Sequence, residues 1–329
     1  SDLYLRRETG KIDYWGIGML VVGIGALQYV LDKGQEADWF ESTSIIALSV
    51  VSAVTLAVLI YHELTTEHPI IDLRVFKERS YATGVFLMTM LGFVLYGSMM
   101  LLPVMLQTLL GYPSMQAGIA MAPRGMGSLV MMPIVGHLTG IIDVRKLLAS
   151  GFFIAGLTLI WLGQLNLHAG YWDIFWPQLL QGTGMALTFV PLTTATMQAI
   201  PPQRMGNAAS LFNLMRNIGG SVGIAVMGTM LARQRQVNSA ILGEHLTIGD
   251  VRTRLMLDQL KGGFMSAGAD AVTAGERSVA AMHGMLAQQA TMVTFVSIFR
   301  LLGGIFLLLI PLIALMKRPK GRPAAAAAH

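Results

Sequence analysis

Eight long apolar stretches dominate the pattern of hydrophobic and polar positions along this chain of 329 residues. A helix needs about 20 apolar residues to cross the roughly 30 Å hydrocarbon core of a bilayer, and shorter polar segments separate the stretches. The stretches are residues 14–31, 44–61, 81–110, 114–142, 144–167, 172–200, 205–232 and 291–316. The pattern predicts an all-α, polytopic membrane protein with eight transmembrane helices.

The composition supports a membrane protein. Hydrophobic residues make up 54% of the chain and charged residues 12%, and the 36 glycines and 23 methionines suit closely packed, pliable helices. The chain has no cysteine, which excludes disulfides and thiol chemistry.

Basic residues fall in alternate connections between the stretches, which predicts the orientation of the chain. The connections on one side hold Arg6, Arg7, Lys11, Arg74, Lys77, Arg79, Arg145, Lys146, Arg204, Lys317, Arg318, Lys320 and Arg322. The short connections on the other side contain only Lys33. By the positive-inside rule both chain ends are cytoplasmic. The net charge of +5 is therefore a topology signal, and we predict no nucleic-acid partner.

These boundaries divide the chain into five predicted parts: a cytoplasmic lead, two transmembrane helices, a cytoplasmic connection, a six-helix bundle and a cytoplasmic tail. They comprise residues 1–12, 13–63, 64–80, 81–317 and 318–329. Residues 233–290, within the bundle, are predicted to form a loop on the outer, periplasmic side of the membrane.

The outer segment, residues 233–290, mixes charges, glycines and short apolar runs. Residues 250–260 have the pattern of an amphipathic helix, and the spacing of Thr273 and Glu276 predicts a capping box for a helix that continues into the last span. Two interpretations remain open at this stage. The segment is either a partly ordered hairpin or a docking surface for a periplasmic partner.

Prolines and glycines interrupt the apolar stretches. Each proline removes a backbone donor, and in lipid the freed carbonyl must be satisfied by neighbouring groups. Six prolines lie inside the predicted spans: Pro103, Pro123, Pro133, Pro177, Pro191 and Pro311. They favour a bundle that rocks, with stretches 114–142 and 172–200 as the moving walls of a cavity.

No Asp or Glu lies in the interior of an apolar stretch, but Arg124, Arg216 and Arg300 do. An arginine at mid-bilayer costs at least ~2.5 kcal/mol, so it needs water, carbonyls or an anion. We favour a functional role for Arg216 and a structural one for Arg300, and leave both open for Arg124. Because arginine is always protonated, the proton-binding group of a proton-driven machine is expected outside this segment.

Amide and hydroxyl groups cluster in two of the stretches. Gln178, Gln181 and Thr188 interrupt residues 172–200, and Asn213 and Asn217 flank Arg216 in the next stretch. Polar groups at this depth usually point into a bundle. They form either a polar cavity or interhelical hydrogen bonds worth about 0.6 kcal/mol each.

Residues 219–223 read Gly-Gly-Ser-Val-Gly and match the nucleophile pattern Gly-x-Ser-x-Gly. That chemistry requires a strand-to-helix turn with a histidine and an acid, so small-residue helix packing is the better interpretation. The sequence shows no metal motif, phosphate loop or paired carboxylate. We therefore predict that the protein is not an enzyme and needs no cofactor.

Three motifs carry a family resemblance. Residues 176–194, 201–210 and 213–221 contain Trp-Pro-Gln-Leu-Leu-Gln-Gly-Thr-Gly, Pro-Pro-Gln-Arg-Met-Gly-Asn and Asn-Leu-Met-Arg-Asn-Ile-Gly-Gly-Ser. They resemble the fourteen-span drug/proton antiporter (EmrB/QacA-type) branch of the Major Facilitator Superfamily. Residues 12–16, 31–39 and 68–76 resemble that branch's two linker spans and the connection after them.

The resemblance implies the carboxyl-terminal part of a two-bundle transporter, with two linker helices followed by the second six-helix bundle. It also implies that the third, fourth, sixth and seventh spans line the cavity, and that the proton-coupling acid belongs to a missing amino-terminal bundle. Residues 136–146 are similar to the family's second gating motif. Its usual early acid is Gly140 here, so Asp143 and Arg145 are the candidate gating pair.

The implied function is proton-coupled export of amphipathic small molecules by alternating access across a bacterial inner membrane, driven by the proton gradient. Candidate apolar contacts in the cavity are Phe93, Tyr96, Met99, Met185 and Phe189. The resemblance also implies a periplasmic adaptor and an outer-membrane channel as partners, with residues 233–290 as the contact. Two alternatives remain: an accessory scaffold that works through its outer segment, and an exporter of one substrate such as a fatty acid or siderophore.

Overall fold

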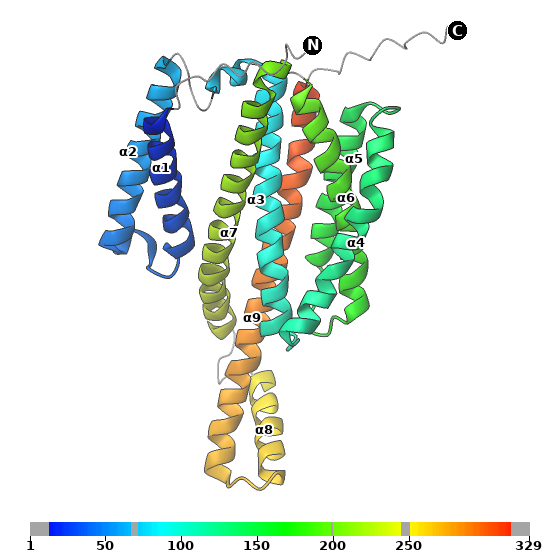
Figure 1. Ribbon diagram of the computed structural model, residues 1–329. Helices are drawn as coiled ribbons and strands as arrows, with labels where there is room; N and C mark the ends of the chain where they lie inside the picture. The colour runs from blue at the N-terminus through cyan, green and yellow to red at the C-terminus, as the bar shows by residue number, and fades with distance from the viewer. Residues whose placement is uncertain (1–12, 67–71, 199, 245–250, 317–329) are drawn as a thin grey trace.

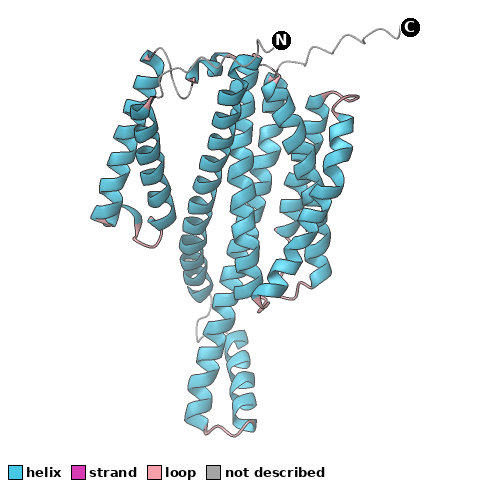
Figure 2. Cartoon of the chain, viewed as in Figure 1, coloured by secondary structure: helices cyan, strands magenta, loops and turns pink. Residues whose placement is uncertain are grey.

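The computed structural model describes residues 13–66, 72–198, 200–244 and 251–316, and this part of the chain contains helices and no strand (Figure 2). The α-helices are α1 Tyr14–Lys33, α2 Thr43–Thr65, α3 Arg79–Thr108, α4 Ser114–Leu138, α5 Val144–Leu162, α6 Tyr171–Met197, α7 Met205–Glu244, α8 Val251–Ser266 and α9 Ala271–Leu309. Short 3-10 helices are η1 Trp39–Glu41, η2 Leu73–Lys77, η3 Pro202–Arg204 and η4 Ile310–Leu315. The all-α prediction is confirmed. The predicted lead, residues 1–12, and tail, residues 318–329, lie outside the described residues.

Each of the eight predicted stretches coincides with one long helix for most of its length, but the stretches predicted at 81–110, 114–142, 144–167 and 172–200 run a few residues past the ends of α3, α4, α5 and α6. Among the described residues six helices are long and apolar enough to cross a membrane, namely α1 to α5 and α9 with its continuation through η4. The chain is therefore a polytopic membrane protein. The polar residues in α6 and α7 make these two helices less apolar, although both run alongside the other helices of the bundle (Figure 1). The count of eight spans stays a prediction.

Helices α3 to α7 and α9 form a bundle in which consecutive helices run in opposite directions, so the closely packed pairs α3–α7 and α4–α6 are each parallel, and the α1–α2 pair lies beside α7 (Figure 1). The chain path alternates in direction, so α1 begins and η4 ends at the same end of the bundle. This agrees with two chain ends on one side of the membrane. That this side is the cytoplasm remains a prediction from the basic residues.

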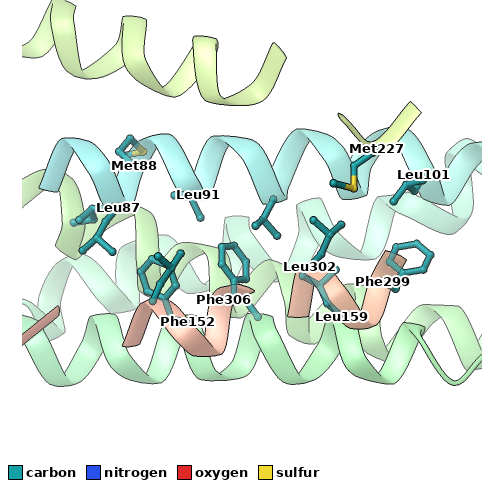
Figure 3. Close-up of a cluster of buried hydrophobic side chains, with 14 of the residues drawn as sticks. Leu87, Met88, Leu91, Leu101, Phe152, Leu159, Met227, Phe299, Leu302 and Phe306 are labelled. Carbon is teal, nitrogen blue, oxygen red and sulfur yellow. The ribbon is translucent and has the colours of Figure 1, made fainter. Parts of the chain in front are cut away.

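The apolar core is built mainly from α3, α5 and α9. Leu87 and Leu91 of α3 and Phe299 of α9 are at most 1% exposed, and they lie among the buried side chains of Figure 3. Phe152 of α5 packs edge-to-face on Phe306 of α9 with ring centroids 5.2 Å apart. These contacts fix the helices against which α6 and α7 pack.

Glycines allow α3 and α7 to touch along their backbones. A Cβ added at Gly219 would collide with the carbonyl oxygen of Thr89, and one at Gly223 with that of Phe93. On the other side of the contact, a Cβ at Gly92 would meet the carbonyl oxygen of Arg216. The predicted small-residue packing at residues 219–223 is confirmed, because these residues lie inside α7 and meet a neighbouring helix.

Five of the six predicted prolines lie inside helices: Pro103 in α3, Pro123 and Pro133 in α4, and Pro177 and Pro191 in α6. Pro311 also lies inside its predicted span, because the last candidate span runs through Leu315, but it falls in the first turn of η4, after α9 has ended. Each of the other five prolines removes one backbone N–H donor from α3, α4 or α6.

The outer segment is helical. Helix α7 continues beyond residue 232 to Glu244, and α8 packs back along α9 in a hairpin that extends past the bundle (Figure 1). With 39 residues, α9 is roughly 58 Å long, about twice the thickness of the hydrocarbon core. The predicted helix at 250–260 is confirmed as α8, although residue 250 lies outside the described part.

The predicted capping box at the start of α9 is wrong. The N-cap is Asp270, whose carboxylate accepts hydrogen bonds from the backbone N–H groups of Val272 at 3.1 Å and Thr273 at 3.2 Å. Hydrogen bonds from Thr273 hold the pKa of Asp270 below its ordinary value of 3.8. Thr273 therefore lies within the first turn, where its N–H is satisfied by a stronger, charged acceptor.

Candidate functional site

Arg124 of α4 is almost completely buried in a network with two glutamines of α6. Its side chain is 5% exposed. Its Nε donates to Oε1 of Gln178 and its Nη2 donates to Oε1 of Gln181, both at 2.9 Å. The glutamines lie one helical turn apart, so a single guanidinium group reaches both amide oxygens.

Close packing of α4 on α6 forces this contact. A Cβ at Gly182 would collide with the carbonyl oxygen of Arg124, and a Cβ at Gly127 with that of Leu179. With the backbones this close, the arginine side chain has to lie along α6. Gly127 and Gly182 therefore allow the close contact between α4 and α6 that forms the site.

The charge of Arg124 is not neutralised within the described part of the chain. Its Nη1 and the Nε2 of Gln178 are buried without a hydrogen-bond partner, and both bonds that Arg124 makes go to uncharged oxygens. A buried cation that has only amide partners keeps most of its desolvation cost. Such a group favours an anion or an acid nearby.

Arg216 of α7 lies over an aromatic ring of α6. Its Cζ is 5.7 Å from the ring centroid of Phe189, which is the geometry of a cation–π interaction. The side chain is half-buried, and its Nε is buried without a hydrogen-bond partner among the described residues. The structure thus brings together two of the predicted cavity residues from different helices.

The other predicted apolar residues lie near this pair of helices. Phe93 and Tyr96 on α3 are partly buried, and a Cβ at Gly220 of α7 would collide with the Tyr96 ring. Met99 is 40% exposed and Met185 on α6 is partly buried. These side chains offer flexible and aromatic surface from α3 and α6.

The polar residues of α7 face away from the core. Asn213 and Asn217 are exposed, and the Nδ2 of Asn213 donates only to the carbonyl oxygen of Ala209, at 3.0 Å. The carbonyl oxygen of Asn217 accepts from the hydroxyl of Ser221 at 3.2 Å. Both amide side chains are therefore accessible to a ligand or to another part of the full-length protein.

Thr188 is placed differently from the other predicted site residues. Its side chain is 1% exposed, donates to the carbonyl oxygen of Gly184 at 2.8 Å, and packs on Gly151 of α5. It therefore lies between α5 and α6, and the structure brings it to neither Arg124 nor Arg216.

The candidate gating residues lie at the start of α5. Asp143 is the N-cap of that helix and accepts a hydrogen bond from the backbone N–H of Arg145 at 3.0 Å. Within the described ranges these two side chains form no ion pair with each other. Helix capping accounts for Asp143, and a gating role remains a prediction.

Sequence reasoning missed the contacts that attach the linker pair to the bundle. The hydroxyl of Ser221 on α7 donates to Oε1 of Gln28 on α1 at 2.7 Å. The indole Nε1 of Trp39 donates to the hydroxyl of Thr229 at 3.2 Å. Gln28 carried the one available signal, because it is an amide inside an apolar stretch.

Two clefts lie at the end of the bundle from which the hairpin extends, one of about 470 Å³ beside α9 and one of about 170 Å³ between α3, α7 and α9. Neither is lined by a predicted cavity residue. Among the predicted residues, Arg124, Gln178, Gln181 and Thr188 are buried between helices, whereas Asn213, Asn217 and Met99 are exposed on α7 and α3.

A polytopic helical bundle with one buried arginine that has no acidic partner among the described residues, and a second, half-buried arginine stacked on an aromatic ring, has the features of a membrane transporter. Residues 15–224 match the family model of the Major Facilitator Superfamily, and the chain belongs to that superfamily. Membership points to a transporter and not to an enzyme.

The chain is similar over most of its length to named drug-resistance proteins, which confirms the predicted resemblance to the EmrB type. It is 35% identical over 321 residues to the multidrug export protein EmrB of Escherichia coli K12, covering 96% of this chain and 60% of that protein. It is 34% identical over 318 residues to the fatty acid resistance protein FarB of Neisseria gonorrhoeae, covering 95% of this chain and 61% of that protein. The probable multidrug resistance protein EmrY of Escherichia coli K12 is 35% identical over 241 residues, covering 72% of this chain and 47% of that protein. The chain thus spans about three fifths of the length of the first two relatives.

Proposed function

We propose that this chain is the carboxyl-terminal part of a proton-coupled multidrug efflux transporter, which exports amphipathic compounds by alternating access. Membership in the superfamily and the names of the relatives support this proposal. The observation that carries it is the half-buried Arg216 stacked on Phe189 beside the exposed amides of α7. An amino-terminal six-helix bundle supplies the opposite wall and the proton-binding acid. The protein lies in the bacterial inner membrane with both ends of this chain in the cytoplasm.

The proposed site divides into two kinds of contact. Phe93, Tyr96, Met99, Met185 and Phe189 provide adaptable apolar surface, which suits substrates of varied shape. Asn213 and Asn217 provide hydrogen bonds, and Arg216 provides a positive field. Gln178 and Gln181 act through Arg124, because their amide oxygens are already bonded to it.

Replacing Arg216 with Ala in the full-length transporter is expected to lower export by roughly tenfold and to change its pH dependence. The positive field of Arg216 favours the ionised form of an acid in the opposite bundle, so removing it raises that acid's pKa. Export should be measured in inverted membrane vesicles at two pH values. Phe189→Leu keeps the charge but removes the cation–π contact, and a smaller loss is expected.

Arg233→Ala is the matched control, because Arg233 is an exposed arginine near the outer end of the same helix. It should leave export unchanged. If Arg216→Ala behaved like this control at both pH values, the proposed role of Arg216 would be wrong.

A carboxylate-bearing substrate is a second candidate. The relative FarB is named for fatty acid resistance, and Arg124 and Arg216 both lack an acidic partner within the described residues. A fatty acid or an acidic siderophore would supply one. If the transporter serves such a substrate, Arg216→Ala reduces export of a fatty acid more than export of a cationic dye, measured in the same vesicles.

We further propose that the α8–α9 hairpin contacts a periplasmic adaptor, which in turn binds an outer-membrane channel. On the hairpin, Leu255 is 58% exposed and Val279 is 44% exposed, and the hairpin extends past the other helices of the bundle (Figure 1). We assign these side chains to the interface because apolar residues that gather into one exposed patch mark a contact surface, whereas single ones do not. An accessory scaffold working through this same surface is the alternative, and a natural start near Ser1 with no further spans upstream would favour it.

Introducing Leu255→Glu and Val279→Glu together should abolish co-purification of the adaptor with the full-length protein, because each buries a charge at the interface. Gln259→Glu on α8 adds the same charge at an exposed polar position and should leave co-purification intact. Undiminished recovery of the adaptor with the double variant would exclude the hairpin as the contact.

A further inference from the structure

The cleft of about 470 Å³ lies between α9 and the connection that joins α5 to α6. Polar side chains enter it from both sides, and Met292, Val293 and Val296 of α9 form an apolar part. The polar lining residues are Asn166, His168, Gln289, Ser297 and Arg300. None of the lining residues is acidic, so Arg300 gives the cleft a positive charge.

Exposed aromatic residues place this cleft at the membrane surface. Trp161 near the end of α5 is 44% exposed, and Trp172 and Trp176 in the first turns of α6 are 63% and 50% exposed. Tryptophan is enriched where acyl chains meet headgroups. The α5–α6 connection, which lines the cleft, joins the helix ends that carry these residues, so the cleft lies at the depth of lipid phosphates.

Arg300 is held in the cleft with its terminal nitrogens available. Its Nε donates to the carbonyl oxygen of Gly163 at 2.8 Å, just after the last turn of α5. A Cβ at Gly163 would lie 2.6 Å from Cγ of Arg300, so the glycine makes room for the arginine stem. Arg300 is exposed, and its Nη1 and Nη2 make no hydrogen bond within the described part of the chain.

We propose that this cleft binds the phosphodiester group of an anionic glycerophospholipid. The two terminal nitrogens of Arg300 form the planar fork that suits two phosphate oxygens. Asn166, Gln289 and Ser297 hydrogen-bond the hydroxyl groups of the headgroup, and Val293 and Val296 contact the start of an acyl chain. A zwitterionic headgroup fits less well, because its ammonium group finds no carboxylate among the lining residues.

The test measures lipid binding and not transport, so its result does not depend on the proposed efflux function. The full-length protein is reconstituted in phosphatidylcholine nanodiscs containing a small fraction of phosphatidylglycerol, and retained lipids are counted by native mass spectrometry. Arg300→Gln should weaken retention of phosphatidylglycerol roughly tenfold, which corresponds to about 1.4 kcal/mol. Arg300→Lys keeps the charge but not the fork, and should give an intermediate result.

Two further variants keep the test decisive. Val293→Trp fills the cleft while leaving Arg300 and its bond to Gly163 in place, and it should also lose the lipid. Arg233→Gln removes an exposed arginine from α7 and should retain it. Equal retention by Arg300→Gln, Val293→Trp and the wild type would overturn the proposal. Displacement of the lipid by millimolar inorganic phosphate would also overturn it, because the site would then be one for free anions.

Discussion

Replacing Gln178 and Gln181 together with Leu is expected to lower the free energy of unfolding by about 3–5 kcal/mol, the usual cost of leaving a buried charge without its partners. Arg124 is 5% exposed and both of its hydrogen bonds end on these two amides. The measurement is chemical or thermal unfolding of the full-length protein in detergent micelles. Gln116→Leu, at an exposed position of α4, is the control and should change the free energy of unfolding by less than about 0.5 kcal/mol.

Adding Arg124→Met to the double variant should restore most of the lost stability. The unpartnered cation is then gone, and an apolar side chain of similar length fills its place between α4 and α6. A triple variant less stable than the double variant would show that the cost does not come from the guanidinium group.

The triple variant also separates two roles of Arg124 that the sequence left open. If Arg124 only joins α4 to α6, a stable triple variant exports substrate normally. If Arg124 supplies a field that transport needs, the same variant folds but does not export. The comparison uses one protein with intact folding, so a loss of export cannot be assigned to misfolding.

Helix positions could be predicted from the sequence because they depend on local properties. The lengths of the apolar runs located the helices, and the glycine spacing at residues 219–223 indicated close helix packing, which α3 and α7 show. The amphipathic pattern at 250–260 likewise predicted most of α8. The residue that caps α9 could not be predicted, because Asp270 and Thr273 are both acceptable N-cap residues. In the structure Asp270 is the N-cap.

The partners of the polar side chains could not be predicted, because they depend on which helix faces meet. The sequence showed Arg124 and Gln178 as polar groups at bilayer depth, but it gave no indication that they bond each other. Thr188 follows Gln181 by one heptad, which places both residues on the same face of the helix. Thr188 nevertheless packs on α5, because Gly151 leaves room there. The Trp39–Thr229 bond joins residues 190 positions apart, and no local pattern reports such a contact.

Because of the glycine contact between α3 and α7, two similar substitutions are expected to change the free energy of unfolding in opposite directions. Gly219→Ala should lower the free energy of unfolding by about 1–3 kcal/mol, the typical cost of overpacking, because its Cβ would collide with the carbonyl oxygen of Thr89. Gly228→Ala on the same helix should instead stabilise the protein by about 0.5–1 kcal/mol, since alanine loses less backbone entropy than glycine. At Gly228 the nearest atom to an added Cβ is the terminal carbon of Met100 at 3.8 Å, an ordinary contact.

The substitution at Gly219 should also affect the proposed site. Arg216 lies one helical turn before Gly219 on α7, and its backbone touches α3 at Gly92. Moving α7 away from α3 therefore shifts Arg216 relative to Phe189. Export by Gly219→Ala should therefore fall even at a temperature where the protein is fully folded, whereas Gly228→Ala should export normally. Unfolding curves and vesicle transport measured on the same preparations test both parts. Equal stability of the two variants would mean that the backbones of α3 and α7 are further apart than the structure places them, and the geometry inferred for Arg216 would fail with that contact.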